Sequence, residues 1–464
     1  MKPMEKYDVI VVGAGASGVF MSYELAKLDI NARVLVLERG GRLEERLCPI
    51  KEGATKHCVK CNPCHIMNGY GGAGTLSDGK YNITTQFGGD LHNYVGVDHA
   101  MELMEYVDEV LCSMGGADAK LYSTASSELK TVCLRNNLHL LEAKVRHLGT
   151  DRNVRILAKM FDYAKKKIEM RFRTTIVDVV READRTFTVV TDNGEEFNCK
   201  DLVLATGRSG SKWISSVCDK MGIEQKKNRV DIGVRVELPA EVFKHITDDV
   251  YESKIVYKTD KYNDMVRTFC MNPYGEVVAE NTNGIVTVNG HSYDSPELHT
   301  NNTNFALLVS NSFTEPFDDS NEYGESIAKL SNMLGGGVLL QRFGDLVKGR
   351  RSSERRMRKC FTRPTLQATP GDLSLVIPKR QLDNIIEMIY ALDKIAPGTA
   401  NEDTLLYGVE VKFYNSVVKV DSNLETKVPG LYALGDGSGV THSLSQASAS
   451  GVYVARILAD KYNA

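Results

Sequence analysis

Three glycines near the start of the chain have a spacing that could serve nucleotide chemistry. Gly13, Gly15 and Gly18 stand in a G-x-G-x-x-G pattern, and Glu38 follows Gly18 by twenty residues. Backbone without side chains can approach a pyrophosphate closely, and a carboxylate at that distance can accept hydrogen bonds from a ribose. The pattern therefore predicts a dinucleotide site, to which Ala16, Ser17 and Arg39 also contribute.

A second glycine-rich turn, near the end of the chain, distinguishes between the dinucleotides. An apolar run ends in Gly435-Asp436, and Gly439 and Val440 follow. Asp436 could bind a ribityl hydroxyl, and the helical pattern over residues 445–459 could direct its N-terminal dipole at the edge of a flavin ring. A separate NAD(P) domain would need a second full fingerprint, which we do not find in the sequence. We therefore expect FAD, bound noncovalently.

Four cysteines lie close together and could hold a metal or exchange electrons. Cys58, Cys61 and Cys64 have C-x2-C-x2-C spacing, and Cys48 lies ten residues upstream of Cys58. Four thiolates suit a [4Fe–4S] cluster or zinc, whereas a CxxC pair can act as a redox dithiol. Free thiols in a structural loop remain a further alternative. The sequence leaves these readings open.

The elements predicted around the glycine motifs are those that a dinucleotide site requires. Residues 7–12 and 33–37 form apolar runs typical of buried strands, and residues 19–28 between them have helical spacing. The order strand, glycine turn, helix, strand, acid is that of a Rossmann-type unit. Residues 172–191 predict two further strands, and residues 201–207 return as another strand that ends at Gly207.

Taken together, these motifs resemble the two-dinucleotide-binding-domain flavoproteins, and more closely the FAD-dependent dehydrogenases of bacteria and archaea, also described as NAD(P)/FAD-dependent oxidoreductases. The resemblance covers nearly the whole chain, and rests also on the cysteine segment 58–64, the glycine loop 69–80 and the block 408–414. It implies FAD and redox chemistry, with Gly207 in the ATG motif of such flavoproteins. One departure is Thr441-His442, where the family pattern has Thr-Arg.

Catalytic candidates lie in three places. The loop 69–80 could line the flavin with its backbone, chiefly at Gly72 and Gly74, and Lys80 could frame the substrate. His442 follows the C-terminal glycine motif and could approach the flavin edge. Arg350 lies in the segment 348–359, which holds seven basic residues and one acid. That segment could bind a carboxylate, a phosphate or NAD(P)H, or it could be a solvated helix face.

The domain organisation follows from these positions. We expect an α/β fold, in which a discontinuous Rossmann-type FAD-binding domain with a β-meander carries an inserted, mixed α+β substrate domain. The predicted FAD-binding domain comprises residues 1–210 and 401–464, and the predicted substrate domain comprises residues 211–400.

Composition and charge exclude some classes of protein and some partners. The 464 residues are 42% hydrophobic and 25% charged, which excludes a disordered or fibrous protein. The net charge is −3, so nucleic acid is not an expected partner. No signal peptide or apolar run of about 18 residues is present, so we expect a cytoplasmic protein without a membrane segment.

The predicted function is FAD-dependent oxidoreduction of a small-molecule substrate. The basic segment favours an anionic substrate. NAD(P)H, an electron-donor protein or the cysteine-ligated centre could supply or accept electrons. Two alternatives remain. One is an electron-transfer or redox-sensing flavoprotein with a cysteine-bound Fe–S cluster. The other is a tRNA-modifying flavoprotein, which a few residues around Cys61-Asn62-Pro63 resemble.

Overall fold

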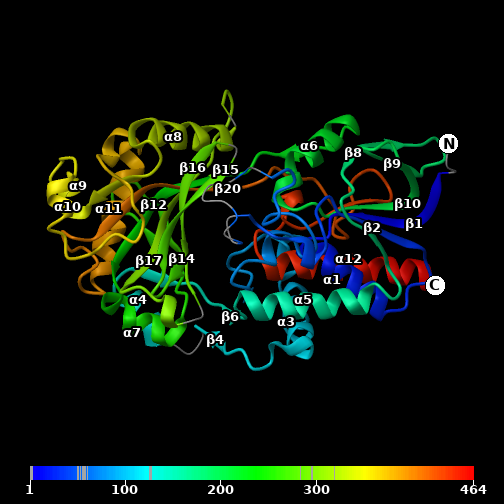
Figure 1. Ribbon diagram of the computed structural model, residues 1–464, viewed down its shortest axis with the longest axis horizontal. Coiled ribbons are helices and arrows are strands. Elements are labelled where there is room, and N and C mark those ends of the chain that lie inside the picture. The colour runs from blue at the N-terminus through cyan, green and yellow to red at the C-terminus, as the bar shows by residue number, and fades with distance from the viewer. Residues whose placement is uncertain are drawn as a thin grey trace. The chain divides into compact units, whose positions relative to one another are not determined.

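The structure is a computed structural model of the chain. It describes residues 4–464 except 50, 51, 53, 55–58, 60, 125–127, 283, 294, 295 and 318. The chain divides into two compact units, which are described separately (Figure 1). The first unit comprises residues 1–121, 145–226 and 415–464, and the second comprises residues 122–144 and 227–414.

The first unit is built on a twisted sheet in which parallel strands occupy the centre. Its strand order is β7-β2-β1-β10-β9-β8, and β22 pairs with the second half of β10. The strands are β1 (Glu5–Val12), β2 (Val34–Leu37), β7 (Glu169–Arg171), β8 (Ile176–Arg181), β9 (Phe187–Thr191), β10 (Glu196–Leu204) and β22 (Leu431–Ala433). The pairs β7–β2, β2–β1, β1–β10 and β10–β22 are parallel, whereas β8, β9 and β10 form an antiparallel meander.

Helices and short strands complete the first unit. The helices are α1 (Ala16–Lys27), α2 (His92–Val95), α3 (Val97–Leu111), α5 (Thr150–Ala164), α6 (Ser211–Lys220) and α12 (Leu444–Asn463). The remaining strands are β3 (Lys80–Ile83), β11 (Gln225–Lys226) and β21 (Val417–Val418), with β4 (Leu121–Ser123) and β6 (Lys144–His147) where the chain passes between the units.

Alternation along β1 explains why both faces of this sheet are covered. Val9 and Val11 belong to a core shared with α1, α3, α5 and α12, whereas Ile10 and Val12 belong to a core shared with α6. Successive side chains of a strand point to opposite faces, so one apolar strand serves two cores. The predicted strand over residues 7–12 therefore forms, and it lies in the middle of the sheet.

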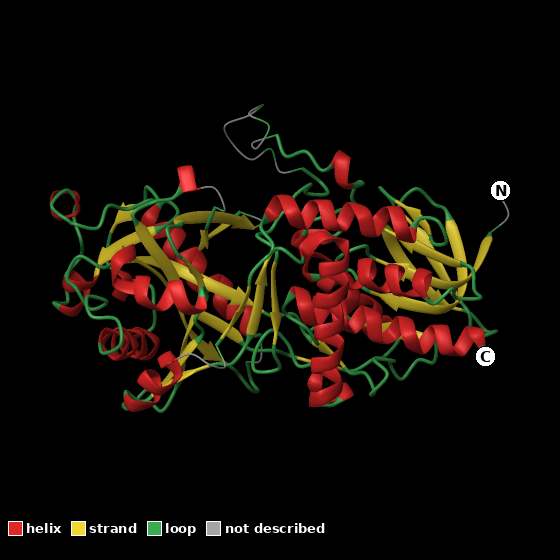
Figure 2. Cartoon of the chain, turned by 90° about the horizontal axis from the view of Figure 1, so that it is seen from below, coloured by secondary structure: helices red, strands yellow, loops and turns green. Residues whose placement is uncertain are grey.

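The second unit is built on a largely antiparallel sheet of order β19-β18-β20-β12-β17-β14-β13-β5. Its strands are β5 (Leu138–Leu140), β12 (Val230–Pro239), β13 (Ile255–Lys258), β14 (Met265–Asn272), β17 (Asn302–Asn311), β18 (Leu339–Arg342), β19 (Thr369–Pro370) and β20 (Leu405–Phe413), besides the hairpin β15 (Glu276–Thr282) and β16 (Ile285–His291). Its helices are α4 (Glu128–Arg135), α7 (Ala240–Val250), α8 (Ser320–Gly335), α9 (Phe343–Val347), α10 (Glu354–Met357) and α11 (Lys379–Asp393). Figure 2 shows the strands of each unit gathered into its own sheet, with helices beside them.

The predicted fold class is confirmed: an α/β unit with a parallel sheet and a meander, and a mixed α+β unit. The division of the chain differs from the predicted one at three places. Residues 122–144 join the second unit because β5 pairs with β13. Residues 401–414 join it because β20 pairs with both β12 and β18. Residues 211–226 stay in the first unit, where Ile214 and Val217 of α6 pack in its core.

Candidate functional site

The predicted cofactor residues of three distant segments leave the same edge of the first unit's sheet. The register pairs Val12 with Leu37 on one side and with Leu204 on the other, and Leu204 pairs with Ala433. All these strands are parallel, so each one ends at this edge. The residues that follow them are therefore neighbours: Gly13, Glu38, Thr206-Gly207 and Gly435-Asp436. In open α/β sheets, ligands bind outside the carboxyl ends of the strands.

At two glycines of the turn after β1, the surrounding backbone leaves no room for a side chain. A Cβ atom on Gly13, whose φ is +107°, would lie 2.4 Å from the backbone oxygen of Ala205. A Cβ atom on Gly18 would lie 2.1 Å from the oxygen of Gly13. These two glycines thus permit the close packing of α1 and β10 against the turn.

Gly15 differs from its neighbours because nothing in the structure requires it to be glycine. A Cβ atom there would meet no atom within 4 Å, and its φ of −73° is open to any residue. Gly15 is the N-cap of α1, and no side chain caps that helix end. Uncapped N–H groups at a helix N-terminus beside open space are what a phosphate requires.

Glu38 is buried and its carboxylate accepts three backbone hydrogen bonds. Its Oε2 accepts from the N–H of Ala14 at 2.8 Å, and its Oε1 accepts from the N–H groups of Gly40 at 2.8 Å and Gly69 at 2.9 Å. A carboxylate has about four acceptor positions, so three backbone donors leave room for one hydroxyl. Glu38 therefore fits the predicted ribose contact and also fixes the turn around it.

The glycine loop that contains Gly72 and Gly74 packs on the first glycine turn. The N–H of Gly71 donates to the oxygen of Ala14 at 2.7 Å, and a Cβ atom on Gly72 would lie 3.0 Å from the Cα of Gly15. A Cβ atom on Gly74 would lie 2.5 Å from the side chain of Leu444, at the start of α12. The loop thus contacts both the N-terminal glycine turn and the start of α12. That its backbone lines the flavin stays a prediction.

Buried Arg46 holds this loop in place. Its guanidinium donates to the backbone oxygens of His65, Ile66, Tyr70 and Gly72 at 2.6–3.0 Å. Burial lowers the pKa of Arg46 to about 10, an effect that the nearby charge of Glu38 opposes. Arg46 stays charged at neutral pH and orders the segment from His65 to Gly72.

The C-terminal glycine turn presents Asp436 at the same edge. Thr441 Oγ1 donates to Asp436 Oδ1 at 2.9 Å, and Asn415 Nδ2 donates to the backbone oxygen of Asp436 at 2.5 Å. Gly439, with φ of +75°, lets the chain turn, and Val440 is fully buried. The backbone oxygen of Val440 accepts from the N–H of Asp90 at 2.8 Å.

These features fit FAD at this edge. A Cβ atom on Gly207 would also meet no atom within 4 Å, so open space lies beside the ends of both β1 and β10. The helix N-terminus, Glu38 and Asp436 would face the pyrophosphate, the adenosine ribose and the ribityl chain, respectively. The Nε of Arg39, also predicted to belong to the site, donates to Asn68 Oδ1 at 2.7 Å.

Of the three catalytic candidates, two lie in the first unit. Lys80 begins β3, its side chain is 9% exposed, and its Nζ lies 3.0 Å from Asp78 Oδ2. The N–H of His442 donates to the oxygen of Gly88 at 2.9 Å, just before α12. Arg350 belongs to the second unit, where its Nε donates to Asp345 Oδ1 at 2.7 Å, so a buried carboxylate engages the guanidinium.

The predicted cysteine centre is only partly described. Cys58 lies outside the described residues, whereas Cys48, Cys61 and Cys64 are partly exposed thiols without a disulfide. Within the described residues, no group of three or more His, Cys, Asp or Glu side chains could hold a metal ion. The Fe–S and zinc readings stay predictions, because a four-cysteine site needs Cys58. The dithiol reading also stays a prediction, since Cys61 and Cys64 are free thiols in the structure.

Sequence reasoning missed several residues that position the site. Arg46, Asn415 and Ser443 were not singled out, although Ser443 caps α12 by accepting from the N–H of Gln446. The Ser443-Leu-Ser-Gln446 stretch has the S-x-x-Q pattern of a capping box, which could have fixed the start of that helix. No comparable local signal marks Arg46, because its four acceptors are backbone oxygens.

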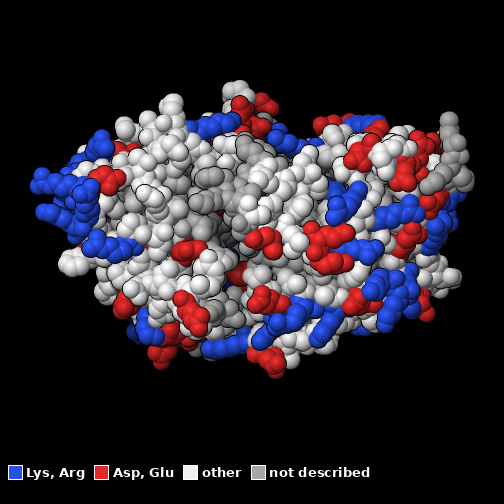
Figure 3. Space-filling view, viewed as in Figure 1, with Lys and Arg blue, Asp and Glu red and all other residues white. Residues whose placement is uncertain are grey.

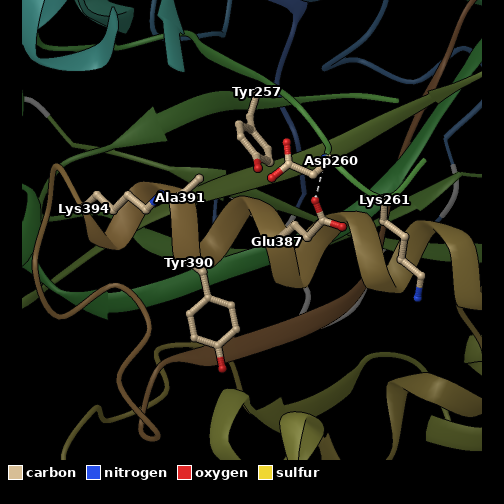
Figure 4. Close-up of a pocket in the computed structure, with 7 residues that line it drawn as sticks. All are labelled: Tyr257, Asp260, Lys261, Glu387, Tyr390, Ala391 and Lys394. Carbon is tan, nitrogen blue, oxygen red and sulfur yellow. Dashed lines mark hydrogen bonds between the residues drawn. The ribbon is translucent and has the colours of Figure 1, made fainter. Parts of the chain in front are cut away.

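A surface pocket of about 410 Å³ in the second unit contains none of the predicted site residues (Figure 4). Its lining is Tyr257, Asp260, Lys261, Glu387, Tyr390, Ala391 and Lys394. The N–H of Asp260 donates to Glu387 Oε2 at 2.9 Å, which ties the loop after β13 to α11. Charges of both signs alternate around it, and no cluster of convergent catalytic groups forms there.

Comparison with known families supports the cofactor assignment. The family described as "FAD-dependent protein, C-terminal domain-like" matches residues 229–413, which is nearly all of the second unit's larger segment. The predicted resemblance to FAD-dependent proteins is confirmed over this segment. The match supports the expectation that the chain is an FAD-dependent oxidoreductase. It is independent of the predicted FAD motifs, because those motifs lie in the first unit.

More distant relatives cover nearly the whole chain. An uncharacterised protein of Clostridium beijerinckii is 26% identical over 475 residues, which span 98% of this chain and 81% of that protein. Glycine oxidase from Geobacillus kaustophilus has 12% identity and a TM-score of 0.41, over 98% of this chain and 95% of that chain. Quinol fumarate reductase FrdA of E. coli has 12% identity and a TM-score of 0.43, over 99% and 71%. Likeness at this distance carries no argument about chemistry.

None of the helices in the described part of the chain combines the length and the apolarity that crossing a bilayer needs.

Proposed function

We propose that the protein is an oxidoreductase that passes hydride or electrons between a small-molecule substrate and noncovalently bound FAD. The observation that carries the proposal is the convergence of Gly15, Glu38, Gly207 and Asp436 at one sheet edge, beside open space. When bound, FAD would supply the hydride chemistry. The family match over residues 229–413 supports the same cofactor.

The chain's own residues bind and orient the cofactor. The uncapped N-terminus of α1 offers N–H groups and a partial positive charge to a pyrophosphate. Glu38 connects the glycine turn to the loop at Gly69, so one carboxylate holds both walls of the site. Thr441 Oγ1 orients the Asp436 carboxylate by donating to its Oδ1 at 2.9 Å.

Lys80 and His442 are the proposed acid–base groups of the first unit. The Lys80 side chain is almost fully buried and pairs with Asp78, so its ammonium is held in one place. His442 is anchored through its backbone N–H at the start of α12. The Lys80 ammonium could give a proton to a substrate, and the His442 ring could give or take one.

The electron partner is a finer part of the proposal. NAD(P)H would bind transiently, because the sequence has a single full dinucleotide fingerprint. An electron-donor protein or a centre ligated by Cys48, Cys58, Cys61 and Cys64 would serve the same purpose. Iron and sulfide assays on protein purified without oxygen distinguish a cluster from free thiols.

The experiment that tests the function is anaerobic reduction of the FAD-loaded protein. NADH, NADPH, amines, amino acids and hydroxy acids are added singly, and loss of the visible flavin absorbance is followed. We expect at least one of these compounds to reduce the flavin rapidly, and reoxidation to release an oxidised product. FAD that binds well but is reduced by none of these donors would count against an oxidoreductase of this class.

Lys80→Met tests the acid–base assignment. We expect flavin reduction to slow about a hundredfold, with FAD content and melting temperature unchanged, since a general acid or base contributes about that factor. Lys165→Met is the matched control, because Lys165 is an exposed lysine of the same unit. Equal rates in both variants would remove Lys80 from catalysis.

A further inference from the structure

Two carboxylates of the second unit, Asp345 and Asp403, hold the basic segment of residues 348–359 and the residues just after it. Asp345 is fully buried and accepts from Arg350 Nε at 2.7 Å, Ser352 Oγ at 2.9 Å and Arg356 Nε at 3.0 Å. Asp403 is paired with Arg342 in the same way. These bonds neutralise the inner arginines and fix the backbone around them.

The outer cations of this segment, and Arg363 just after it, have no such partners. They are exposed, and no carboxylate pairs with any of them in the part of the chain that the structure describes; they are Arg351, Arg355, Arg358, Lys359 and Arg363. Glu354 is the acid that lies among them. Lys and Arg side chains gather at the edge of the view where Figure 1 labels α9 and α10 (Figure 3).

Phe361 stands in the middle of these cations with its side chain in solvent. It is 90% exposed, whereas its neighbours Cys360 and Thr362 are 1% and 2% exposed. The Phe361 N–H donates to Asp403 Oδ2 at 2.9 Å, and the Cys360 thiol contacts the Asp403 backbone oxygen at 3.4 Å. The ring is therefore presented on a fixed backbone rather than on a loose loop.

The turn around Phe361 is closed by a further hydrogen bond. Arg363 Nη1 donates to the backbone oxygen of Arg358 at 3.1 Å, so the residues before and after Phe361 are joined. A phenyl ring that stays exposed to water forgoes the free energy that its burial would contribute to stability. A rigidly presented ring among unpaired cations marks a binding surface.

We propose that this surface, formed by residues 351–363, binds single-stranded nucleic acid. Arginine side chains pair with phosphates through a planar fork, and an exposed aromatic ring stacks on a base. Every base offers such a face, so one ring and five cations suffice for sequence-tolerant binding. The net charge of −3, which argued against nucleic acid at the level of the whole chain, does not describe this surface.

A protein partner fits the surface less well. Protein interfaces have an apolar centre rimmed by polar groups, and they need an area of about 1,000 Å². Within residues 348–363, Phe361 is the one exposed large apolar side chain among the described residues. A single ring cannot make an apolar centre of that size, whereas it can stack on a base.

The test is fluorescence anisotropy of a labelled oligouridine of about 12 nucleotides, a length within the range that such sites cover. Full-length protein loaded with FAD is titrated at several salt concentrations. Phe361→Ala should weaken binding about tenfold, and Phe361→Trp should restore it, because stacking needs only an aromatic face. Leu375→Ala is the matched control, since Leu375 is 65% exposed in the same unit.

A triple variant tests the cations. Arg355→Gln, Arg358→Gln and Lys359→Gln together should make the negative slope of log affinity against log salt shallower by about 2. Each phosphate contact on a single strand contributes about 0.7 to the magnitude of that slope. Lys258→Gln with Lys394→Gln removes exposed charges of the same unit elsewhere and should leave the slope unchanged.

Three results would overturn the proposal. The first is absence of oligouridine binding at low salt by protein that carries FAD. The second is binding that Phe361→Ala does not weaken, which would reduce the surface to charge alone. The third is displacement of the oligonucleotide by a poly-glutamate peptide at equal charge concentration, which would point to an acidic protein partner instead.

Discussion

Glu38 and Gly69 are 31 residues apart in the chain, yet the Glu38 Oε1 accepts a hydrogen bond from the Gly69 N–H at 2.9 Å. The same carboxylate holds the N–H of Ala14 in the first glycine turn. One buried acid therefore connects the two glycine-rich walls of the proposed cofactor site. This explains why an acid at this position has two roles, one toward the protein and one toward a ribose.

The first prediction concerns this carboxylate. Glu38→Gln should lower the free energy of unfolding by about 2 kcal/mol, because the amide NH2 of glutamine cannot accept from the buried backbone donors that it would face. Urea unfolding of the protein without FAD measures this effect separately from cofactor loss. Glu182→Gln is the control, since Glu182 is exposed in the turn between β8 and β9 of the same unit. Equal stability of Glu38→Gln and the unmodified protein would show that the carboxylate does not hold the turn.

The second prediction concerns the crossing of α1 and α12. A Cβ atom on Gly451 would lie 2.1 Å from the backbone oxygen of Ser17, so any side chain there forces the helices apart. Gly451→Ala should destabilise the protein by about 1–3 kcal/mol, although alanine favours a helix.

Thermal unfolding measures this difference, and weaker FAD binding should accompany it, because α1 starts at the proposed pyrophosphate site. Asp460→Ala, at an exposed position of the same helix, should change stability by less than about 0.5 kcal/mol. A melting temperature for Gly451→Ala at or above that of the unmodified protein would contradict the close crossing.

The third prediction concerns how stability depends on pH through Asp383, a residue outside the proposed cofactor site. Burial raises the pKa of Asp383, but hydrogen bonds from Lys261, Lys379 and Tyr262 outweigh it and lower the pKa from 3.8 to about 2. A carboxyl with a lowered pKa in the folded protein stabilises the fold above its unfolded pKa. That contribution is lost as the pH falls from 3.8 toward 2.

Asp383→Asn should therefore cost about 1 kcal/mol at pH 7, a value reduced because solvent screens the exposed lysines. The difference from the unmodified protein should be constant down to about pH 5 and shrink below pH 3.8. Urea unfolding at pH 7, 5 and 3 measures it, with Glu241→Gln, an exposed acid of α7, as the control. A difference that does not depend on pH would mean that Asp383 acts by packing rather than charge.

The parts of the fold that local patterns describe could be predicted from the sequence. The apolar run of β1, the glycine turn and the run of β2 are contiguous, and each has a local physical signature. The resemblance of Gly207 and Asp436 to a flavoprotein pattern predicted that their distant segments lie close to the first glycine turn. The parallel pairing of β1 with β10 and of β10 with β22 agrees with that prediction.

The division into units could not be predicted because it depends on pairing between distant residues. β5 has three residues, and its place in the second unit is fixed only by pairing with β13 more than a hundred residues later. β20 is assigned by its pairing with β12, from which it is separated by almost the whole second unit. Arg46 was missed for a similar reason, since its role depends on backbone oxygens that a fold has to bring near.

The central claim is that FAD binds at the edge where Gly15 caps α1, and flavin binding by Gly15→Val tests it most directly. The added Cβ atom enters open space, so the variant without FAD should keep the circular dichroism of the unmodified protein and lose only about 1 kcal/mol of stability, the cost of replacing an N-cap glycine. We predict that the unmodified protein binds an equimolar amount of FAD, measured by its absorption spectrum and by fluorescence titration, and that Gly15→Val binds little or none. Unmodified protein that takes up no FAD, or a folded Gly15→Val that binds it equally well, would contradict the account.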